Sequence, residues 1–121
     1  MNCPCTPSKL YVECCEKAHL NIATVTSPET LMRSRYTAFV LANIDYLQKS
    51  HYSKTRPSKW EKKEILQWTK SVEWIRLDIL NTTKNTVEFK AYFMENGQVD
   101  CIHENSVFCK ENGYWVYKCG Q

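Results

Sequence analysis

Two Asn-Gly pairs in the second half of the chain place the strongest constraint on its fold. Asn96-Gly97 and Asn112-Gly113 each suit the two-residue loop of a β-hairpin, because asparagine and glycine tolerate the positive φ angles that such loops need. Residues 87–93 alternate apolar and polar side chains, as a half-buried strand does, and residues 74–80 alternate in the same way. From about residue 72 onward, the sequence therefore predicts an antiparallel meander.

The first half of the chain carries helix signals instead. Ser27 offers a capping hydroxyl directly before Pro28, which suits the first position of a helix. Ser58 and Glu61 have the spacing of a capping box. The sequence predicts helices at residues 28–42, 44–50 and 58–70. Helices followed by a meander predict an α+β domain, in which the helices cover one face of a curved antiparallel sheet.

The hairpin loops also predict which residues share a face of the sheet, because cross-strand partners can be counted outward from each loop. One face is predicted to carry Phe89, Ala91, Phe93, Ile102, Glu104, Ser106, Phe108, Tyr117 and Cys119. Glu104 and Ser106 are polar residues among apolar neighbours, and a buried carboxylate is costly without a cation or hydrogen-bond donors. Arg33 or Arg35, on the first helix, could supply the cation.

Glu104 therefore has two interpretations. The favoured one is a structural Arg-Glu pair that locks the first helix onto the sheet. The alternative is a ligand pocket between helices and sheet, in which Glu104 acts as an acid, a base or a ligand anchor. The candidate pocket residues are Arg35, Tyr36, Trp74, Glu104, Ser106 and Tyr117. His103 is expected on the opposite face, away from Glu104.

Four cysteines crowd the first fifteen residues, as Cys3-Pro4-Cys5 and Cys14-Cys15. Two close thiol pairs at this separation can converge on one tetrahedral ion if the chain reverses between them, and zinc is the expected metal. A closed four-thiolate site leaves no open position for a substrate, so we expect a structural or adhesive role. His19 could replace one ligand, because the side chains of adjacent cysteines tend to diverge. The alternative is a frayed N-terminus with free thiols.

The three remaining cysteines do not resemble a second cluster. Cys101 and Cys109 are predicted on the opposite face of the sheet from Cys119, as isolated residues.

Charge and hydropathy narrow the classes of partner. The net charge of +3 is small and the lysines are dispersed, so we do not expect binding to nucleic acid. No signal-peptide pattern and no long apolar run occur, which predicts a cytoplasmic protein with no membrane partner.

The N-terminal run resembles the SEC-C motif, a small zinc-binding module with the pattern C-P-C-G-S-G-K-K-Y-K-K-C-C. All four cysteines match, as do Pro4, Lys9 and Tyr11, whereas Thr6, Pro7 and Ser8 stand where the motif has Gly-Ser-Gly. The motif and a linker would occupy residues 1–26.

Residues 27–121 resemble the second part of the YchJ-like family, bacterial proteins of uncharacterised function that join a SEC-C motif to a nuclear transport factor 2-like (NTF2-like) α+β cone. The resemblance rests on residues 27–40, 103–108 and 113–117. It implies a cavity in the cone where Arg35, Glu104 and Ser106 would lie. It does not indicate a reaction that the protein would catalyse.

Together these features predict a bacterial metal-binding protein that holds zinc through its N-terminal cysteines and acts through a protein partner. We expect no catalytic activity, because the sequence has no evident nucleophile and base pair. A further hypothesis is homodimerisation through the outer face of the sheet, with Tyr92, Met94, Val99 and Val116 as contact residues. The alternative function is a small-molecule binding protein or enzyme that uses the cavity around Arg35 and Glu104.

Overall fold

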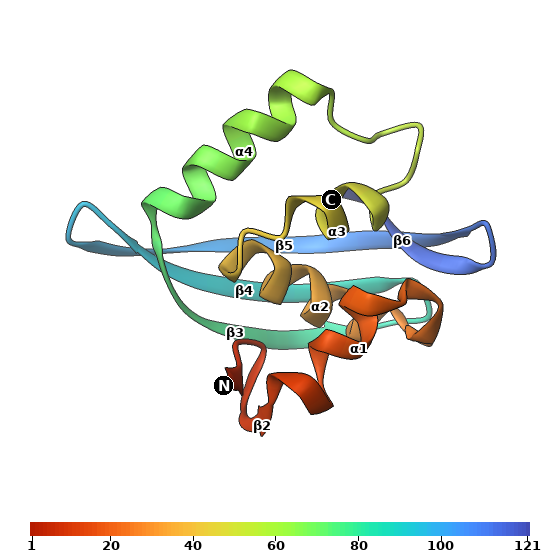
Figure 1. Ribbon diagram of the computed structural model, residues 1–121, viewed down its shortest axis with the longest axis horizontal. Coiled ribbons are helices and arrows are strands. Elements are labelled where there is room, and N and C mark those ends of the chain that lie inside the picture. Colours follow the sequence, from red (N-terminus) through yellow and green to blue (C-terminus); the bar gives the residue numbers. More distant parts are fainter.

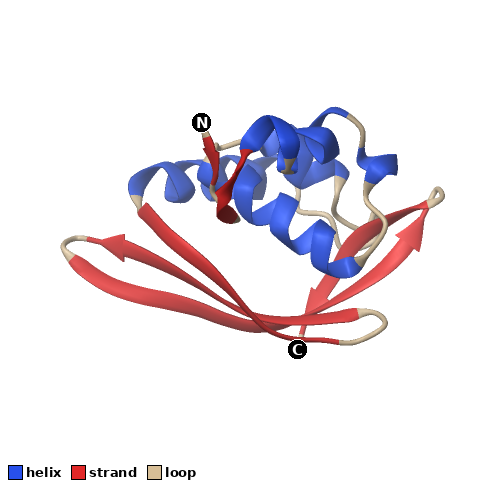
Figure 2. Cartoon of the chain, turned by 90° about the horizontal axis from the view of Figure 1, so that it is seen from below, coloured by secondary structure: helices blue, strands red, loops and turns tan.

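The computed structural model describes residues 1–121 as helices packed on one face of a curved sheet. Figure 2 shows the two layers, with the opposite face of the sheet left without helices. The larger sheet has the order β3-β4-β5-β6, and all its neighbouring strands are antiparallel. Its strands are β3 (Glu73–Thr82), β4 (Thr86–Glu95), β5 (Gln98–Glu111) and β6 (Tyr114–Gly120). The predicted α+β fold is confirmed.

The first two predicted helices begin at the predicted residues, and the third begins one residue later than predicted, because Ser58 is its cap. They are α2 (Pro28–Val40), α3 (Ile44–Lys49) and α4 (Lys59–Ser71). The Ser27 hydroxyl accepts a hydrogen bond from the Thr30 amide at 3.2 Å. Ser58 and Glu61 form the complete capping box, which satisfies amide groups at the start of α4 that have no partner within the helix. None of the helices combines the length and the hydrophobicity of a membrane-spanning helix.

The N-terminal segment folds back on itself before α2. It contains β1 (Asn2–Cys3), β2 (Thr6–Leu10), a 3-10 helix at Tyr11–Glu13, α1 (Cys15–Leu20) and a second 3-10 helix at Ile22–Thr24. Its buried residues Cys3, Cys5 and Cys15 belong to the same apolar cluster as Leu31 of α2 and Phe108 of β5. The N-terminal segment is therefore packed into the core of the molecule.

Both Asn-Gly pairs form hairpin loops with positive φ angles. The angles are 53° at Asn96, 78° at Gly97, 56° at Asn112 and 86° at Gly113. The predicted register follows from these loops, with Phe89 opposite Glu104 and Lys110 opposite Trp115 among the observed pairs. The register counted outward from both loops is therefore correct near them.

One predicted position on this sheet is wrong. The pairing of β5 with β6 shifts between Val107 and Phe108, so Cys119 lies opposite Val107 and Gly120 lies opposite Ser106. Cys119 therefore shares a face with Cys109, rather than with Glu104 as predicted. The physical reason is a bulge, which adds one residue to a strand and reverses the faces beyond it.

The two outer strands of the sheet are irregular or covered. The β3–β4 pairing shifts twice, between Trp74 and Arg76 and again between Ile79 and Asn81. Along β6, the Tyr117 amide donates to the carbonyl of Ser50 and the Tyr52 amide donates to the carbonyl of Tyr117, both at 2.8 Å. The segment after α3 therefore runs beside β6 and occupies part of its outer edge.

Thr69 links α4 to the rest of the domain. Its buried hydroxyl donates to the carbonyl of Phe39 at 2.8 Å and accepts from the indole of Trp74 at 3.2 Å.

We predict that Thr69→Val lowers the free energy of unfolding by about 1 kcal/mol, because valine keeps the shape and removes both hydrogen bonds. Urea denaturation measures this change. The same substitution at exposed Thr82, whose hydroxyl has no partner, should change the free energy of unfolding by less than about 0.5 kcal/mol. Equal effects at the two sites would contradict the prediction.

Candidate metal centre and internal cavity

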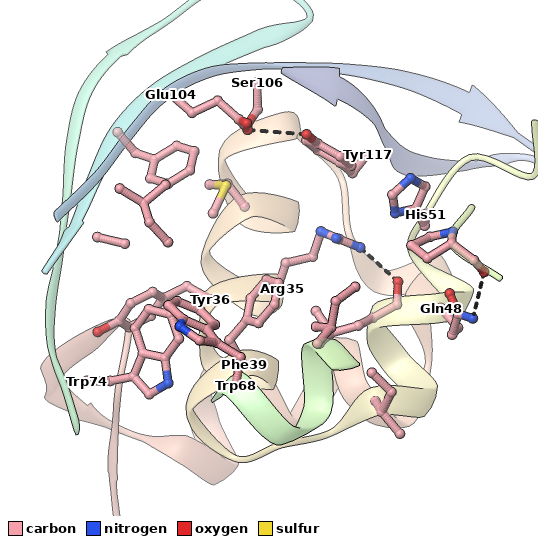
Figure 3. Close-up of a pocket in the computed structure, with 18 of the residues that line it drawn as sticks. Arg35, Tyr36, Phe39, Gln48, His51, Trp68, Trp74, Glu104, Ser106 and Tyr117 are labelled. Carbon is pink, nitrogen blue, oxygen red and sulfur yellow. Dashed lines mark hydrogen bonds between the residues drawn. The ribbon is translucent and has the colours of Figure 1, made fainter. Parts of the chain in front are cut away.

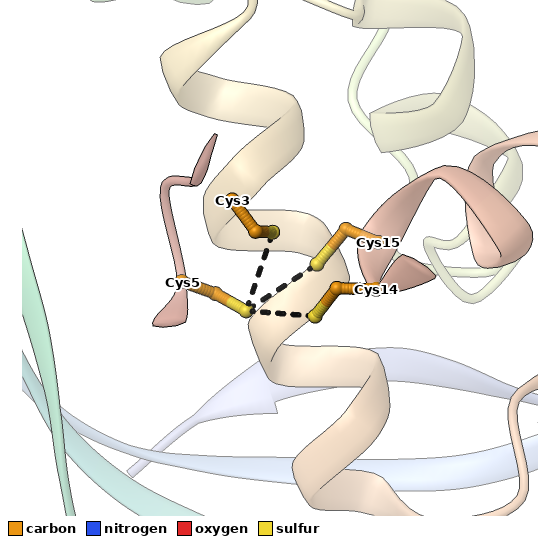
Figure 4. A group of neighbouring side chains, drawn as sticks. All are labelled: Cys3, Cys5, Cys14 and Cys15. Carbon is orange, nitrogen blue, oxygen red and sulfur yellow. Dashed lines mark hydrogen bonds between the residues drawn. The ribbon is translucent and has the colours of Figure 1, made fainter. Parts of the chain in front are cut away.

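The sulfur atoms of the four N-terminal cysteines converge on one point (Figure 4). All four lie within 4.8 Å of one another. Cys5 Sγ is 3.6 Å from Cys3 Sγ, 3.6 Å from Cys14 Sγ and 3.5 Å from Cys15 Sγ. A tetrahedral ion with metal–sulfur bonds of about 2.3 Å would set its sulfur ligands about 3.8 Å apart. The donor set and its spacing therefore fit a tetrahedral thiolate site.

The backbone at Cys14 explains how two adjacent cysteines can face the same point. Cys14 lies between the 3-10 helix at Tyr11–Glu13 and α1, with φ of −124° and ψ of −106°. This conformation lies outside the helical and strand regions, so the side chains of Cys14 and Cys15 do not diverge as they would in a strand. The predicted divergence is thereby avoided.

Polar groups from α2 and the N-terminal segment surround the sulfurs. The Thr37 hydroxyl donates to Cys15 Sγ at 3.2 Å and lies 3.7 Å from Cys3 Sγ. Arg33 donates to the carbonyl of Cys5 at 3.1 Å and to the hydroxyl of Thr6 at 3.3 Å. Such groups hold ligating side chains in place and stabilise negative charge on them.

The thiols are not equivalent in their acidity. The hydrogen bond from the Cys15 thiol lowers the pKa of Cys5 to about 5, against the opposing effect of burial. Burial raises the pKa of Cys14 to about 11, and the hydrogen bond to Cys5 raises the pKa of Cys15. Negative charge in the cluster therefore concentrates on Cys5, which is the common neighbour of the other three sulfurs.

His19 lies outside the cysteine cluster. Its Nδ1 is 2.7 Å from the Tyr11 hydroxyl, and its Nε2 is 2.8 Å from the carbonyl of Ser34. Burial lowers its pKa. In this arrangement both ring nitrogens bind other groups, and His19 ties α1 to α2.

A second site lies between the helices and the concave face of the sheet (Figure 3). It is a cavity of about 320 Å³ whose lining is mostly hydrophobic. All six predicted pocket residues line it. The cavity also has lining residues that the sequence did not single out, among them Phe39, Gln48, His51, Lys62, Ile65 and Trp68. Gln48 lies in α3, and His51 lies two residues after the end of this helix. Because α3 is so short, its sequence has no periodic pattern that would indicate which side faces inward.

The predicted pair between Arg35 and Glu104 does not form. Arg35 Nη1 instead donates to the carbonyl of Leu47 at 2.9 Å and to the Ser50 hydroxyl at 2.7 Å. The reason is that α3 ends beside Arg35 and leaves its last carbonyl groups in need of donors. Arg33, the other candidate, pairs with Glu29 at 3.0 Å.

Glu104 is held by hydroxyl groups of its own sheet. Its Oε2 accepts hydrogen bonds from Ser106 and, at 3.3 Å, from the Tyr117 hydroxyl. A Cβ atom at Gly120 would lie 2.2 Å from Glu104 Oε1, so the carboxylate packs directly over this glycine. His103 lies on the opposite face of the sheet from Glu104, as predicted, and pairs with Glu88 at 2.7 Å.

The charges along the cavity are unevenly distributed. Burial lowers the pKa of Arg35 to about 10, which leaves the guanidinium charged at neutral pH. Burial, and then the charge of Arg35, lower the pKa of His51 to about 4, so its imidazole is neutral there. The guanidinium lies over the ring of Tyr117, with 4.9 Å between Arg35 Cζ and the ring centroid. Burial and then the charge of Glu104 raise the pKa of Tyr117 to about 12.

Three of the four residues predicted to form a dimer contact are at least partly exposed, and one is buried. Val99 is 60% exposed, and Tyr92 and Met94 are partly exposed. Val116 is 0% exposed, so it cannot contribute to contacts with a second copy. Homodimerisation through the other three residues stays a prediction.

Two solved structures resemble this one over nearly its whole length. The solution structure of RPA3114, a SEC-C motif containing protein from Rhodopseudomonas palustris, has a TM-score of 0.80 and 31% identity, covering 100% of this chain and 98% of that one. The crystal structure of a SEC-C motif containing protein from Psychrobacter arcticus has a TM-score of 0.78 and 27% identity, covering 98% of this chain and 81% of that one.

Sequence comparison identifies the family. A UPF0225 protein of Vibrio parahaemolyticus is 40% identical over 122 residues, covering 96% of this chain and 72% of the relative. A UPF0225 protein of Shewanella sp. strain MR-4 is 42% identical over 132 residues, covering 98% of this chain and 79% of the relative. The family model of the YchJ middle NTF2-like domain matches residues 27–120. The predicted resemblance is confirmed, and the chain belongs to the UPF0225 family, with a YchJ-type NTF2-like domain at residues 27–120.

Proposed function

We propose that this protein binds zinc through Cys3, Cys5, Cys14 and Cys15 and acts by holding a protein partner. The observation that carries the proposal is the convergence of four sulfur atoms within 4.8 Å. An all-thiolate tetrahedral donor set favours zinc over the harder divalent cations. We also propose a cytoplasmic location, because thiolate ligands persist in a reducing compartment.

The bound ion would be structural. With four protein ligands no coordination position remains for a substrate, and the ion would cross-link β1 to the start of α1. The hydroxyl of Thr37 and the guanidinium of Arg33 would orient the ligands from α2. Metal binding would then stabilise the N-terminal segment against α2.

We predict that the protein purified without chelator contains about one equivalent of zinc per chain, as expected for a closed Cys₄ site. Cys3→Ser should lower this content strongly, because it removes a buried ligand. Cys101→Ser is the matched control, since Cys101 lies on β5, away from the cluster, and should leave the metal content unchanged. Elemental analysis measures the content, and cobalt substitution reports thiolate ligation by absorbance. Wild-type protein without zinc would contradict the proposal.

The outer surface of the N-terminal segment supports the partner part of the proposal. Leu10 is 45% exposed, Val12 is 56% exposed and Leu20 is 80% exposed. Isolated exposed apolar side chains are common, but these three belong to one short segment that wraps around the cysteine cluster. A partner that binds there would contact a surface whose shape depends on the metal.

We predict that a variant with both Leu10→Ser and Leu20→Ser keeps its zinc and loses the partner that wild-type protein captures from cells. The loss should follow from the removal of apolar contact area. Val99→Ser is the control, because Val99 is 60% exposed but lies on β5. Chemical cross-linking and mass spectrometry identify and quantify the partner. If the double variant retains the partner, this surface is not the docking site.

The cavity favours a second candidate function, the binding of a small molecule. Its volume of about 320 Å³ lies at the lower end of the range for ligand sites, and its lining combines many apolar side chains with a few polar ones. If the site is catalytic, Glu104 would be the group to donate or accept a proton, since Ser106 and Tyr117 hold it beside the cavity.

We predict that the uncharged probe phenylacetamide enters the cavity and shifts the NMR signals of the Trp68 and Trp74 indoles, which line it. Trp60 and Trp115 do not line the cavity and serve as internal controls in the same spectrum. An Ala91→Leu variant should weaken binding, because Ala91 lies on the cavity wall and a larger side chain reduces the open volume. Equal shifts at all four tryptophans would indicate nonspecific binding and contradict the prediction.

A further inference from the structure

The cavity has two chemically different ends. Figure 3 shows Tyr36, Phe39, Trp68 and Trp74 gathered at one end, and Arg35 directed toward the other end, near His51 and Tyr117. Trp68 and Trp74 meet edge to face with 5.6 Å between their ring centroids. This aromatic end offers ring faces and edges to a flat apolar group.

Arg35 is a buried cation without a carboxylate partner. The residue is 7% exposed, and no carboxylate oxygen lies within 4.0 Å of its guanidinium nitrogens. Its hydrogen bonds to protein use Nη1 alone. Nε and Nη2 have no hydrogen-bond partner in the protein, and Arg35 is one of the residues that line the cavity. A buried charge with unused donors is costly unless a ligand pairs with it.

None of the other ionisable groups of the cavity forms an ion pair with Arg35. Glu104 attracts the Arg35 guanidinium through its charge but does not pair with it. Its carboxylate accepts hydrogen bonds from two hydroxyl groups, and the ring of Tyr117 lies against the guanidinium. Lys62 pairs with Asp45 at 3.6 Å. The end of the cavity around Arg35 is therefore positive and provides planar N–H donors, which match the two oxygens of a carboxylate.

We infer that the cavity binds a small aromatic carboxylate, with its carboxylate on Arg35 and its ring against Trp68 and Trp74. This inference rests on the small-molecule function proposed above and gives that function a ligand class. The volume of about 320 Å³ suits a compound with one or two rings. The neutral His51, which also lines the cavity, adds polar atoms near Arg35, whereas the Gln48 amide donates to the carbonyl of Pro57 at 3.2 Å.

The decisive experiment compares three probes of nearly equal shape on wild-type protein: phenylacetate, phenylacetamide and phenethylamine. Titration followed by NMR at the Trp68 and Trp74 indoles gives the three dissociation constants. Phenylacetate should bind at least about ten-fold more tightly than phenylacetamide, because hydrogen bonds between charged partners are worth more than neutral ones. This comparison needs no variant and so does not depend on the folding of a mutant.

Two variants test which charged residue causes the preference for phenylacetate over phenylacetamide. Arg35→Lys keeps a positive charge but removes the planar pair of donors, so it should lose most of the preference for phenylacetate over phenylacetamide. Glu104→Gln removes the negative charge from the cavity and should bind phenylacetate as tightly as wild type or more tightly. Circular dichroism and urea denaturation check that both variants are folded, since Arg35 also binds the end of α3.

The possible results distinguish a failure of carboxylate recognition from a failure of small-molecule binding in the cavity. Equal binding of phenylacetate and phenylacetamide would overturn the carboxylate inference and leave small-molecule binding intact. Tighter binding of phenethylamine would overturn it as well, because Glu104 would then dominate recognition. If none of the three probes shifts the indole signals of Trp68 and Trp74, both the inference and the small-molecule function are wrong.

Discussion

The enclosure of α2 on nearly all sides is the constraint on which the rest of the structure depends. This helix buries Leu31 and Ala38 completely, and its polar residues Ser34 and Thr37 are also buried. The N-terminal segment covers one side of it, α3 lies against another, and the sheet lies beneath (Figure 1). Because an α-helix turns by about 100° per residue, neighbouring residues of α2 face different environments. One helix can therefore serve both sites of the molecule.

The two sites lie on opposite faces of α2. Arg33 and Thr37 contact the cysteine segment, whereas Arg35 and Phe39 line the cavity. A shift of α2 along its axis would alter the support of the sulfur atoms and the position of the guanidinium together. The run of polar residues in α2 thus has a structural explanation, since each hydroxyl or guanidinium group has a partner of its own.

The sequence predicted those features that depend on local chemistry. The Asn-Gly loops set the register of both hairpins, and capping groups such as Ser27 and Ser58 marked the starts of helices. Features that depend on longer-range packing were missed. Cys119 lies on the other face because of a bulge with no sequence signal, and Arg35 binds α3 because that helix ends beside it. His51 was missed because its place in the cavity depends on the segment that runs along β6.

The borders of the sheet bear on how the protein behaves at high concentration. A long regular strand at a sheet border presents unpaired amide and carbonyl groups, which invite strands from other molecules and lead to aggregation. Here the segment at residues 50–52 pairs with part of the edge strand β6, and two register shifts make the other edge strand, β3, irregular. Strand addition from a second copy is therefore disfavoured at both borders. Any self-association should instead use side chains on the open face of the sheet, which makes it reversible and sensitive to surface substitutions.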